Sequence, residues 1–386
     1  MTDGTRVATR PGGSLGTPRA RRRIPVVMPA AAAWLMFAGL HRALSGRVWW
    51  WQVPELVPPL AFAAVPVVLL AAVAVARRAR RTAVAMALVS LVLGGGAGGL
   101  NLASLWHRAT PAPPDAISVF SWNTWYWDQP AVGGQPMPPP TGTPRRDVDG
   151  FYRYLRAQHA DVLLLQEYVY FGADSRPIRV NDLDRLRREF PGYHVATVGE
   201  LVTLSRFPIV AQRGLDLRPW LEDGRDTPVP PGSGWPGFHT VKTLRTDLRV
   251  GGRTVSFYNT HINTPVDSSP PGLDPRRLNR TQHEARKANL RALAADVRAN
   301  PLPAFLAGDF NASPAMGILR LLPQRLTDAA PAIDSLYPAT WDDRWPLWRI
   351  DWAFTTPEVA VHEYRLVPSQ GQSDHSGQRL VISLTR

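Results

Sequence analysis

The sequence predicts an α/β protein in which two β-sheets pack face to face with helices outside, preceded by three membrane-spanning helices. Two patterns support this. From about residue 116 onward, short apolar runs that end in polar residues alternate with stretches of helical spacing. Before that point, three long apolar runs follow one another. A chain of 386 residues is long enough for a membrane segment and one large domain.

The apolar runs cover residues 24–44, 53–76 and 82–106. Each has about the 20 residues that a helix needs to cross roughly 30 Å of hydrocarbon. The three tryptophans at 49–51, between the first two runs, are typical of a membrane–water interface. Buried core helices are the alternative, which three nearly charge-free runs in succession disfavour. We therefore expect a three-helix transmembrane anchor over 24–106.

The arginines predict the orientation of this anchor. They are concentrated in the leading segment, 1–23, and in the second loop, 77–81, whereas the first loop holds only Arg42 and Arg47. Basic segments stay in the cytoplasm, so three crossings place the chain after Trp106 outside it. A cleaved signal sequence at the first run would lead to the same placement of the C-terminal domain.

Charge and cysteine content narrow the function classes. Residues 1–110 hold 13 arginines against two acids, whereas residues 111–386 hold 31 basic and 29 acidic residues. The C-terminal part is therefore close to neutral, which disfavours a nuclease with a broad cationic surface. The chain has no cysteine, which excludes thiol nucleophiles, cysteine-ligated zinc and disulfides.

Proline-rich stretches separate the elements of the chain. Residues 107–115 read as a linker, and the stretches 130–144 and 226–237 predict surface loops. Helical spacing predicts helices over 148–160 and 277–300. Apolar runs predict strands at 116–122, 161–167, 194–204, 239–249, 254–260, 303–308, 349–354 and 379–385.

Polar residues follow many of these strands directly. Taken singly, each is an ordinary cap or turn residue. Their recurrence as one set is not explained in that way. Together they supply four carboxylates, two amides and two imidazoles, which suit an oxygen-rich Mg²⁺ or Mn²⁺ site and phosphate chemistry. The residues are Asn123, Glu167, His261, Asp309, Asn311, Asp351, Asp374 and His375.

The set also resembles a known family. The motifs SWN, LQE, TH, GDFN, ID and SDH occur in the order found in the endonuclease/exonuclease/phosphatase (DNase I-like) family, and the resemblance spans about residues 116–386. That family includes deoxyribonucleases, abasic-site endonucleases, neutral sphingomyelinases and inositol polyphosphate phosphatases. The resemblance implies a four-layered α/β sandwich with the site at the end of the two sheets.

The resemblance implies a metal site and a phosphate site. Glu167 matches the principal metal ligand, Asn123 lies beside it, and Asp374 completes the acidic cluster. The implied cofactor is Mg²⁺ or Mn²⁺.

The catalytic roles follow from the same resemblance. Asp309 matches the residue that orients or deprotonates the attacking water, and Asn311 matches the amide that holds the phosphate. His375 matches the imidazole that contacts the scissile phosphate, with Asp351 fixing its tautomer. His261 matches the histidine of the deoxyribonuclease and sphingomyelinase branches.

Three spans followed by an outward-facing domain resemble the actinobacterial membrane proteins associated with teicoplanin resistance (VanJ-like). This resemblance implies a multi-pass cell-membrane enzyme acting on a lipid carrier such as undecaprenyl pyrophosphate, with the bilayer as partner. A membrane-tethered nuclease, a sphingomyelinase-like phosphodiesterase and a sensor on an inactive scaffold are the alternatives. The last is disfavoured because every expected polar position is occupied.

Overall fold

A computed structural model of the chain describes residues 26–75, 80–106, 110–128, 147–171, 176–222, 227–266 and 274–385. Several predicted segments lie wholly or partly outside the described residues. They include the basic N-terminus 1–23, most of the arginine-rich loop 77–81, the first part of the linker 107–115, the proline-rich stretch 130–144, and the first residue of the stretch 226–237.

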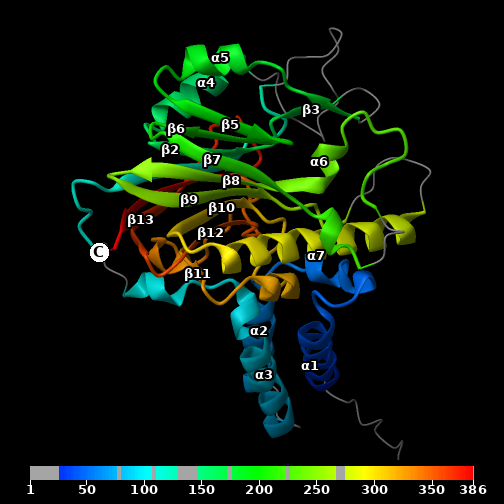
Figure 1. Ribbon diagram of the computed structural model, residues 1–386. Coiled ribbons are helices and arrows are strands. Elements are labelled where there is room, and N and C mark those ends of the chain that lie inside the picture. Colours follow the sequence, from blue (N-terminus) through cyan, green and yellow to red (C-terminus); the bar gives the residue numbers. More distant parts are fainter. Residues whose placement is uncertain are drawn as a thin grey trace, which may run out of the picture.

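The C-terminal part consists of two six-stranded sheets that pack face to face (Figure 1). The first sheet has the order β13 (Val359–Val367), β14 (Gly377–Leu384), β1 (Ile117–Asn123), β2 (Val162–Gln166), β6 (Leu201–Ser205) and β5 (His194–Val198). The second has the order β11 (Thr327–Asp328), β12 (Asp351–Thr355), β10 (Ala304–Asp309), β9 (Arg253–His261), β8 (Val241–Val250) and β7 (Ile209–Asp216). A separate hairpin pairs β3 (Val169–Phe171) with β4 (Pro177–Arg179).

Each sheet has one parallel pair near its centre, and these pairs determine where the polar strand ends meet. In the first sheet β1 and β2 run parallel, and Asn123 pairs with Gln166. In the second sheet β9 and β10 run parallel, and Asp309 pairs with His261. Strand β12 is antiparallel to β10 and begins at Asp351, opposite Asp309. Four strand ends and one strand start therefore gather their polar residues at one edge of the sandwich.

Alternation along the strands produces the layers. Val119 and Leu164 face the second sheet and pack with Phe257 and Phe305 in the central core. Their neighbour Trp122 faces the opposite way, toward helix α4 (Val148–Ala157). Helix α5 (Leu183–Glu189) also covers this outer face (Figure 1).

Helix α7 (Pro275–Ala299) covers the other sheet with the apolar stripe predicted from its sequence. Leu290, Leu293 and Val297 are buried against Tyr258 and Leu306. Helices α4 and α5, the two sheets and helix α7 form four layers, as the sequence predicted.

Two features of the sandwich differ from the sequence prediction. The expected strand 194–204 is a hairpin of β5 and β6, because Gly199 turns the chain with a φ of +56°. Strands β7, β11 and β13 were not predicted. Most residues of β7 are exposed, most of β13 are only partly buried, and β11 has two residues, so none of them forms a clear apolar run.

The N-terminal part contains α1 (Val27–Leu44), α2 (Ala61–Val75) and α3 (Arg80–Gly94). Two helical stretches, 27–44 and 81–98, are long and apolar enough to span a membrane, which indicates membrane association. Three separate spans are not confirmed. Within the second expected span, 53–76, the 3₁₀ turn Pro54–Leu56 belongs to a stretch over 49–56 that joins α2 with a bend of 59°.

Prolines and glycines explain these interruptions. Pro54, Pro58 and Pro59 precede α2, where each removes a backbone donor from a continuous helix. The third expected span was drawn to residue 106, but α3 gives way to a 3₁₀ turn at Gly95–Gly98, and Gly99 has a φ of +70°.

The anchor contacts the sandwich directly, through the ends of its helices. Ser45 Oγ accepts a hydrogen bond from Gly317 N (2.6 Å), and His41 Nε2 lies 2.7 Å from Ala315 O. Asn101 Nδ2 donates to two carbonyl oxygens of the segment 330–333. Figure 1 shows α1–α3 projecting from the side of the sandwich that carries α7 and β11. The anchor and the domain therefore form a packed junction.

Trp51 belongs to this junction and does not lie in an exposed interfacial belt. Its side chain is buried and its Nε1 donates to His41 Nδ1 (3.3 Å). Trp50, its neighbour, is half-exposed.

We expect Gly317→Ala to destabilise the junction. A Cβ at this position would lie 2.2 Å from the carbonyl oxygen of Ser45, so the backbone must move. Overpacking of this kind costs about 1–3 kcal/mol, measured as the free energy of unfolding of the full chain in detergent. Gly234→Ala, where a Cβ meets nothing within 4 Å, is the matched control. Equal stability of the two variants would contradict the packed junction.

Candidate active site

The eight predicted site residues gather at one edge of the sandwich, and each lies within 4 Å of another. Asn123 joins the two sheets. Its Nδ2 donates to Glu167 Oε1 (3.1 Å) on the first sheet and to Asp309 Oδ2 (3.0 Å) on the second. Its Oδ1 accepts from Trp125 N (3.0 Å). Asn123 therefore aligns two carboxylates that come from different sheets.

The backbone around Glu167 is held in uncommon conformations. Glu167 itself has a φ of +61°, and the three residues Trp125, Tyr126 and Trp127 are also left-handed. This turn directs Tyr126 N at Glu167 Oε2 (2.9 Å). Left-handed non-glycine residues are costly and concentrate at functional sites.

The GDFN motif owes its first residue to strand packing. Gly308 has a φ of +146°, and a Cβ there would lie 1.9 Å from Thr260 O of the neighbouring strand. The turn that follows places Asn311 N on Asp309 Oδ1 (2.7 Å). Asn311 Nδ2 donates to Asp309 Oδ2 (3.2 Å) and lies 3.4 Å from His261 Nε2.

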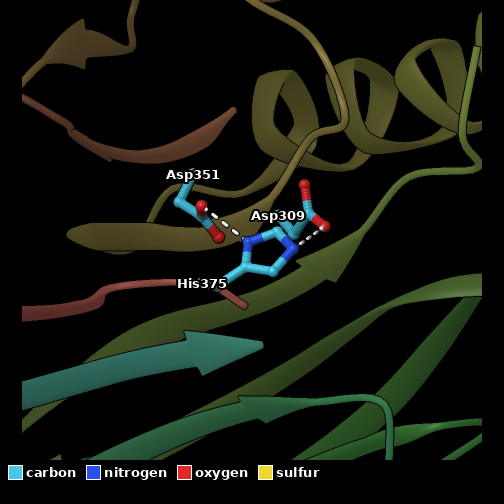
Figure 2. A group of neighbouring side chains, drawn as sticks. All are labelled: Asp309, Asp351 and His375. Atoms are coloured by element: carbon cyan, nitrogen blue, oxygen red, sulfur yellow. Dashed lines mark hydrogen bonds and ion pairs between the residues drawn. The ribbon is translucent and has the colours of Figure 1, made fainter. Parts of the chain in front are cut away.

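His375 lies between two aspartates (Figure 2). Its Nδ1 is 2.9 Å from Asp351 Oδ2, and its Nε2 is 3.8 Å from Asp309 Oδ2 and 3.9 Å from Asp374 Oδ1. Burial opposes the charge of His375, but these carboxylates outweigh it and hold its pKa well above the usual value. Asp351 is thus placed to fix the tautomer of His375, as the sequence suggested.

A second histidine–carboxylate pair faces the first. His261 Nδ1 lies 3.1 Å from Glu200 Oε1, and His261 Nε2 lies 3.7 Å from Asp309 Oδ2. Glu200 also pairs with the buried Lys242. Burial disfavours the charge of Glu200, yet Lys242 and His261 together hold its pKa at about 2.

Glu200 and Lys242 were not predicted from the sequence. Glu200 lies in the turn between β5 and β6, inside the segment that was read as one strand. A Gly-Glu pair interrupting an apolar run is the signal that could have indicated the turn.

The donor set fits a hard divalent cation. Burial raises the pKa of Glu167; His261 opposes this shift, and Glu200 and Asp374 add to it. A bound cation would offset this cost, and the oxygens of Glu167 and Asp374 are the ligand type that Mg²⁺ or Mn²⁺ prefers. The amide oxygen of Asn123, predicted beside the metal, accepts a hydrogen bond from Trp125 N, and its second lone pair could still face a cation.

Asp309, Asp351 and His375 also present ligand atoms within 4.8 Å of one another. Their hydrogen bonding favours an acid–base role over a metal site. The Nδ1 of His375 is bonded to Asp351, so this nitrogen is not available to a cation.

Arg286 forms hydrogen bonds to two loops next to the site. It is buried on α7, and its Nη1 donates to Asn263 O (2.6 Å) and to Asn311 O (3.0 Å). Burial lowers its pKa to about 10, and Glu55 of the anchor and Asp309 oppose that shift. One buried guanidinium thus holds the loops that follow β9 and β10.

The sequence profile of the Endonuclease/Exonuclease/phosphatase family matches residues 120–375, which include all eight site residues. The chain belongs to this family. Its members are hydrolases that act on phosphate esters. A search of curated proteins finds no match.

Several solved structures are similar to this chain over about 70% of its length. An endonuclease/exonuclease/phosphatase from Bacteroides vulgatus has 17% identity and a TM-score of 0.47, and the alignment covers 70% of this chain and 99% of that one. A mannosyl-6-phosphatase of Bacteroides thetaiotaomicron has 16% identity and a TM-score of 0.47, with 69% and 100% covered. The human Nocturnin catalytic domain has 16% identity and a TM-score of 0.47, with 71% and 97% covered.

We expect the pair Glu200–Lys242 to behave as a buried ion pair. Glu200→Gln leaves the ammonium of Lys242 buried without its partner, which should lower the free energy of unfolding by about 3 kcal/mol or more. Adding Lys242→Met should restore most of that loss. The measurement is a double-mutant cycle by chemical denaturation, with Asp184→Asn, in an exposed pair with Arg187, as the control that costs under about 1 kcal/mol. A double variant no more stable than Glu200→Gln alone would refute the pairing.

Proposed function

We propose that this protein is a membrane-anchored, metal-dependent phosphoesterase whose substrate is a membrane lipid phosphate or pyrophosphate. The observation that carries the proposal is the position of Asp309. This buried carboxylate lies between His375, His261 and Asn311, with Glu167 held beside it by Asn123. Such a site combines a base, amide and imidazole donors and an acidic cluster around one point.

Asp309 is the group that takes the proton from the attacking water. Burial raises its pKa above the ordinary value, which strengthens it as a base, and Asn311 N fixes its orientation through Oδ1. Asn311 Nδ2 and the Nε2 atoms of His375 and His261 surround the Oδ2 side, where they can hold the phosphate oxygens. A divalent cation on Glu167 and Asp374 would neutralise phosphate charge.

The membrane anchor supports a lipid substrate. The junction through Ser45, Asn101 and their partners keeps the site at a fixed place beside the helices, so a substrate in the same bilayer is presented at high effective concentration. The near-neutral charge of residues 111–386 supplies little of the counterion-release energy that drives polyanion binding. An undecaprenyl-type carrier lipid is the substrate that we infer, as in the resemblance to teicoplanin-resistance membrane proteins.

The chemistry is tested by metal removal and substitution. Phosphate-ester hydrolysis should require Mg²⁺ or Mn²⁺ and stop in excess chelator. Glu167→Gln, Asp309→Asn and His375→Gln should each lower kcat by on the order of 100-fold or more with the fold retained. Asp184→Asn, an exposed acid on α5, should leave kcat unchanged. Undiminished turnover by the Asp309 variant, or in chelator, would refute the mechanism.

The orientation is tested in spheroplasts. Protease added outside should digest the domain after Trp106, because the arginine-rich segments 1–23 and 77–81 are inferred to stay in the cytoplasm. Permeabilised spheroplasts serve as the positive control for cleavage. Protection of the domain until permeabilisation would reverse the orientation and point to cytoplasmic substrates.

The substrate class is tested by direct comparison. At equal enzyme and about 0.15 M salt, phosphate release from undecaprenyl pyrophosphate should exceed nicking of supercoiled plasmid. The Asp309→Asn variant sets the background in both assays. Efficient nicking without lipid turnover would make a tethered nuclease the function.

A further inference from the structure

A cavity lies at the junction of anchor and domain, apart from the active site. Its volume is about 840 Å³. None of the eight site residues lines it. Its walls come from the end of α1, from α2 and α3 with the turn that follows, and from the segment 314–324 of the domain. It therefore opens where the apolar helices meet the sandwich.

Two arginines at this cavity are not paired with any carboxylate of the described residues. Arg42, near the end of α1, and Arg320, in the 3₁₀ turn Gly317–Leu321, both line it and are exposed. Among the residues that the structure describes, no carboxylate forms an ion pair with either, and the one hydrogen bond of Arg320 is a long contact of 3.4 Å to Ser45 O. Arg349, in the same cavity, differs in being paired with Asp328 (2.9 Å).

The arginines near this cavity also lie close enough for their positive charges to repel one another. Burial lowers the pKa of Arg320, and the charges of Arg42 and Arg47 lower it further, with Glu55 opposing them. The two nearby carboxylates have other partners, because Glu55 accepts from Gly46 N and Asp328 pairs with Arg349. A bound anion would therefore lower the repulsion between the arginines. Phosphate oxygens are the anion for which guanidinium groups are best shaped.

The remaining wall is apolar and continuous with the helices that can span a membrane. Phe62 and Leu93 line the cavity, and Val92 beside them is 82% exposed. A free phosphate ion would leave this surface uncovered. A molecule with an anionic head and a hydrocarbon tail would satisfy both parts of the cavity.

We infer that this cavity binds the phosphate head of an anionic membrane lipid, with Arg42 and Arg320 on the phosphate and an acyl chain along Phe62, Val92 and Leu93. The inference rests on insertion of the N-terminal helices in a membrane and is independent of the phosphoesterase chemistry. The cavity also touches Ala315 and Met316, which follow the GDFN motif closely, so the lipid braces the segment behind the active site.

The test is a lipid titration of the full-length protein in detergent micelles, read by native mass spectrometry. Wild type should retain one phosphatidylglycerol and should bind phosphatidylcholine much more weakly. The double variant Arg42→Ala/Arg320→Ala should bind phosphatidylglycerol on the order of tenfold more weakly or worse. The single variant Arg320→Lys, which keeps the charge, should retain most of the binding.

The matched control carries the same change of charge elsewhere. Arg249→Ala/Arg298→Ala removes two exposed arginines of β8 and α7 and should bind phosphatidylglycerol as wild type does. Equal loss in both double variants, or equal binding of phosphatidylcholine, would overturn the site. Binding of inorganic phosphate alone with the affinity of the lipid would overturn the role of the apolar wall. Retained lipid with no hydrolytic activity would refute the proposed function and leave this inference standing.

Discussion

The site depends on one requirement, which is that a buried negative charge must be compensated. Asp309 is 2% exposed, and its two oxygens face Asn311 N, Asn123 Nδ2 and Asn311 Nδ2, with both histidines beyond. Because Asn123 belongs to the first sheet and Asp309 to the second, satisfying this carboxylate also fixes how the two sheets meet at their polar edge. A second contact joins the same two sheets, in which Gln166 Nε2 donates to Asn259 Oδ1 (2.7 Å). Polar contacts between the sheets thus contribute both to the packing of the sandwich and to the geometry of the site.

Much of this arrangement could be predicted because it is local in sequence. An apolar run that ends in a polar residue predicts both a strand and a candidate functional side chain. Asn123, Glu167 and Asp309 were identified in that way. Glu200 and Lys242 could not be, since their significance comes from a contact across 42 positions of the chain between two buried side chains. Alternation alone cannot reveal a partner that lies on another strand.

The anchor shows the same limit. Length and hydropathy identified the apolar runs, but not where each helix ends, because prolines and glycines interrupt the helices and contacts with the domain hold the residues beyond the interruptions. Asn101 lies inside the third run and looks like an isolated polar residue in the sequence. In the structure its amide donates to carbonyl oxygens of Ala330, Ile333 and Ser335, so it belongs to the domain rather than to the membrane. A run drawn on composition therefore extended several residues too far.

The packed junction has a consequence for the surface chemistry of the domain. Trp348 Nε1 donates to Leu56 O of the anchor, and the same loop carries Trp345, 80% exposed, and Leu347. On a freely diffusing protein, large apolar side chains of this kind would favour aggregation. If the N-terminal helices insert in a membrane as proposed, the junction would hold this face toward the lipid headgroups, where exposed apolar side chains do not lead to aggregation. Indole rings are the side chains best suited to such a boundary.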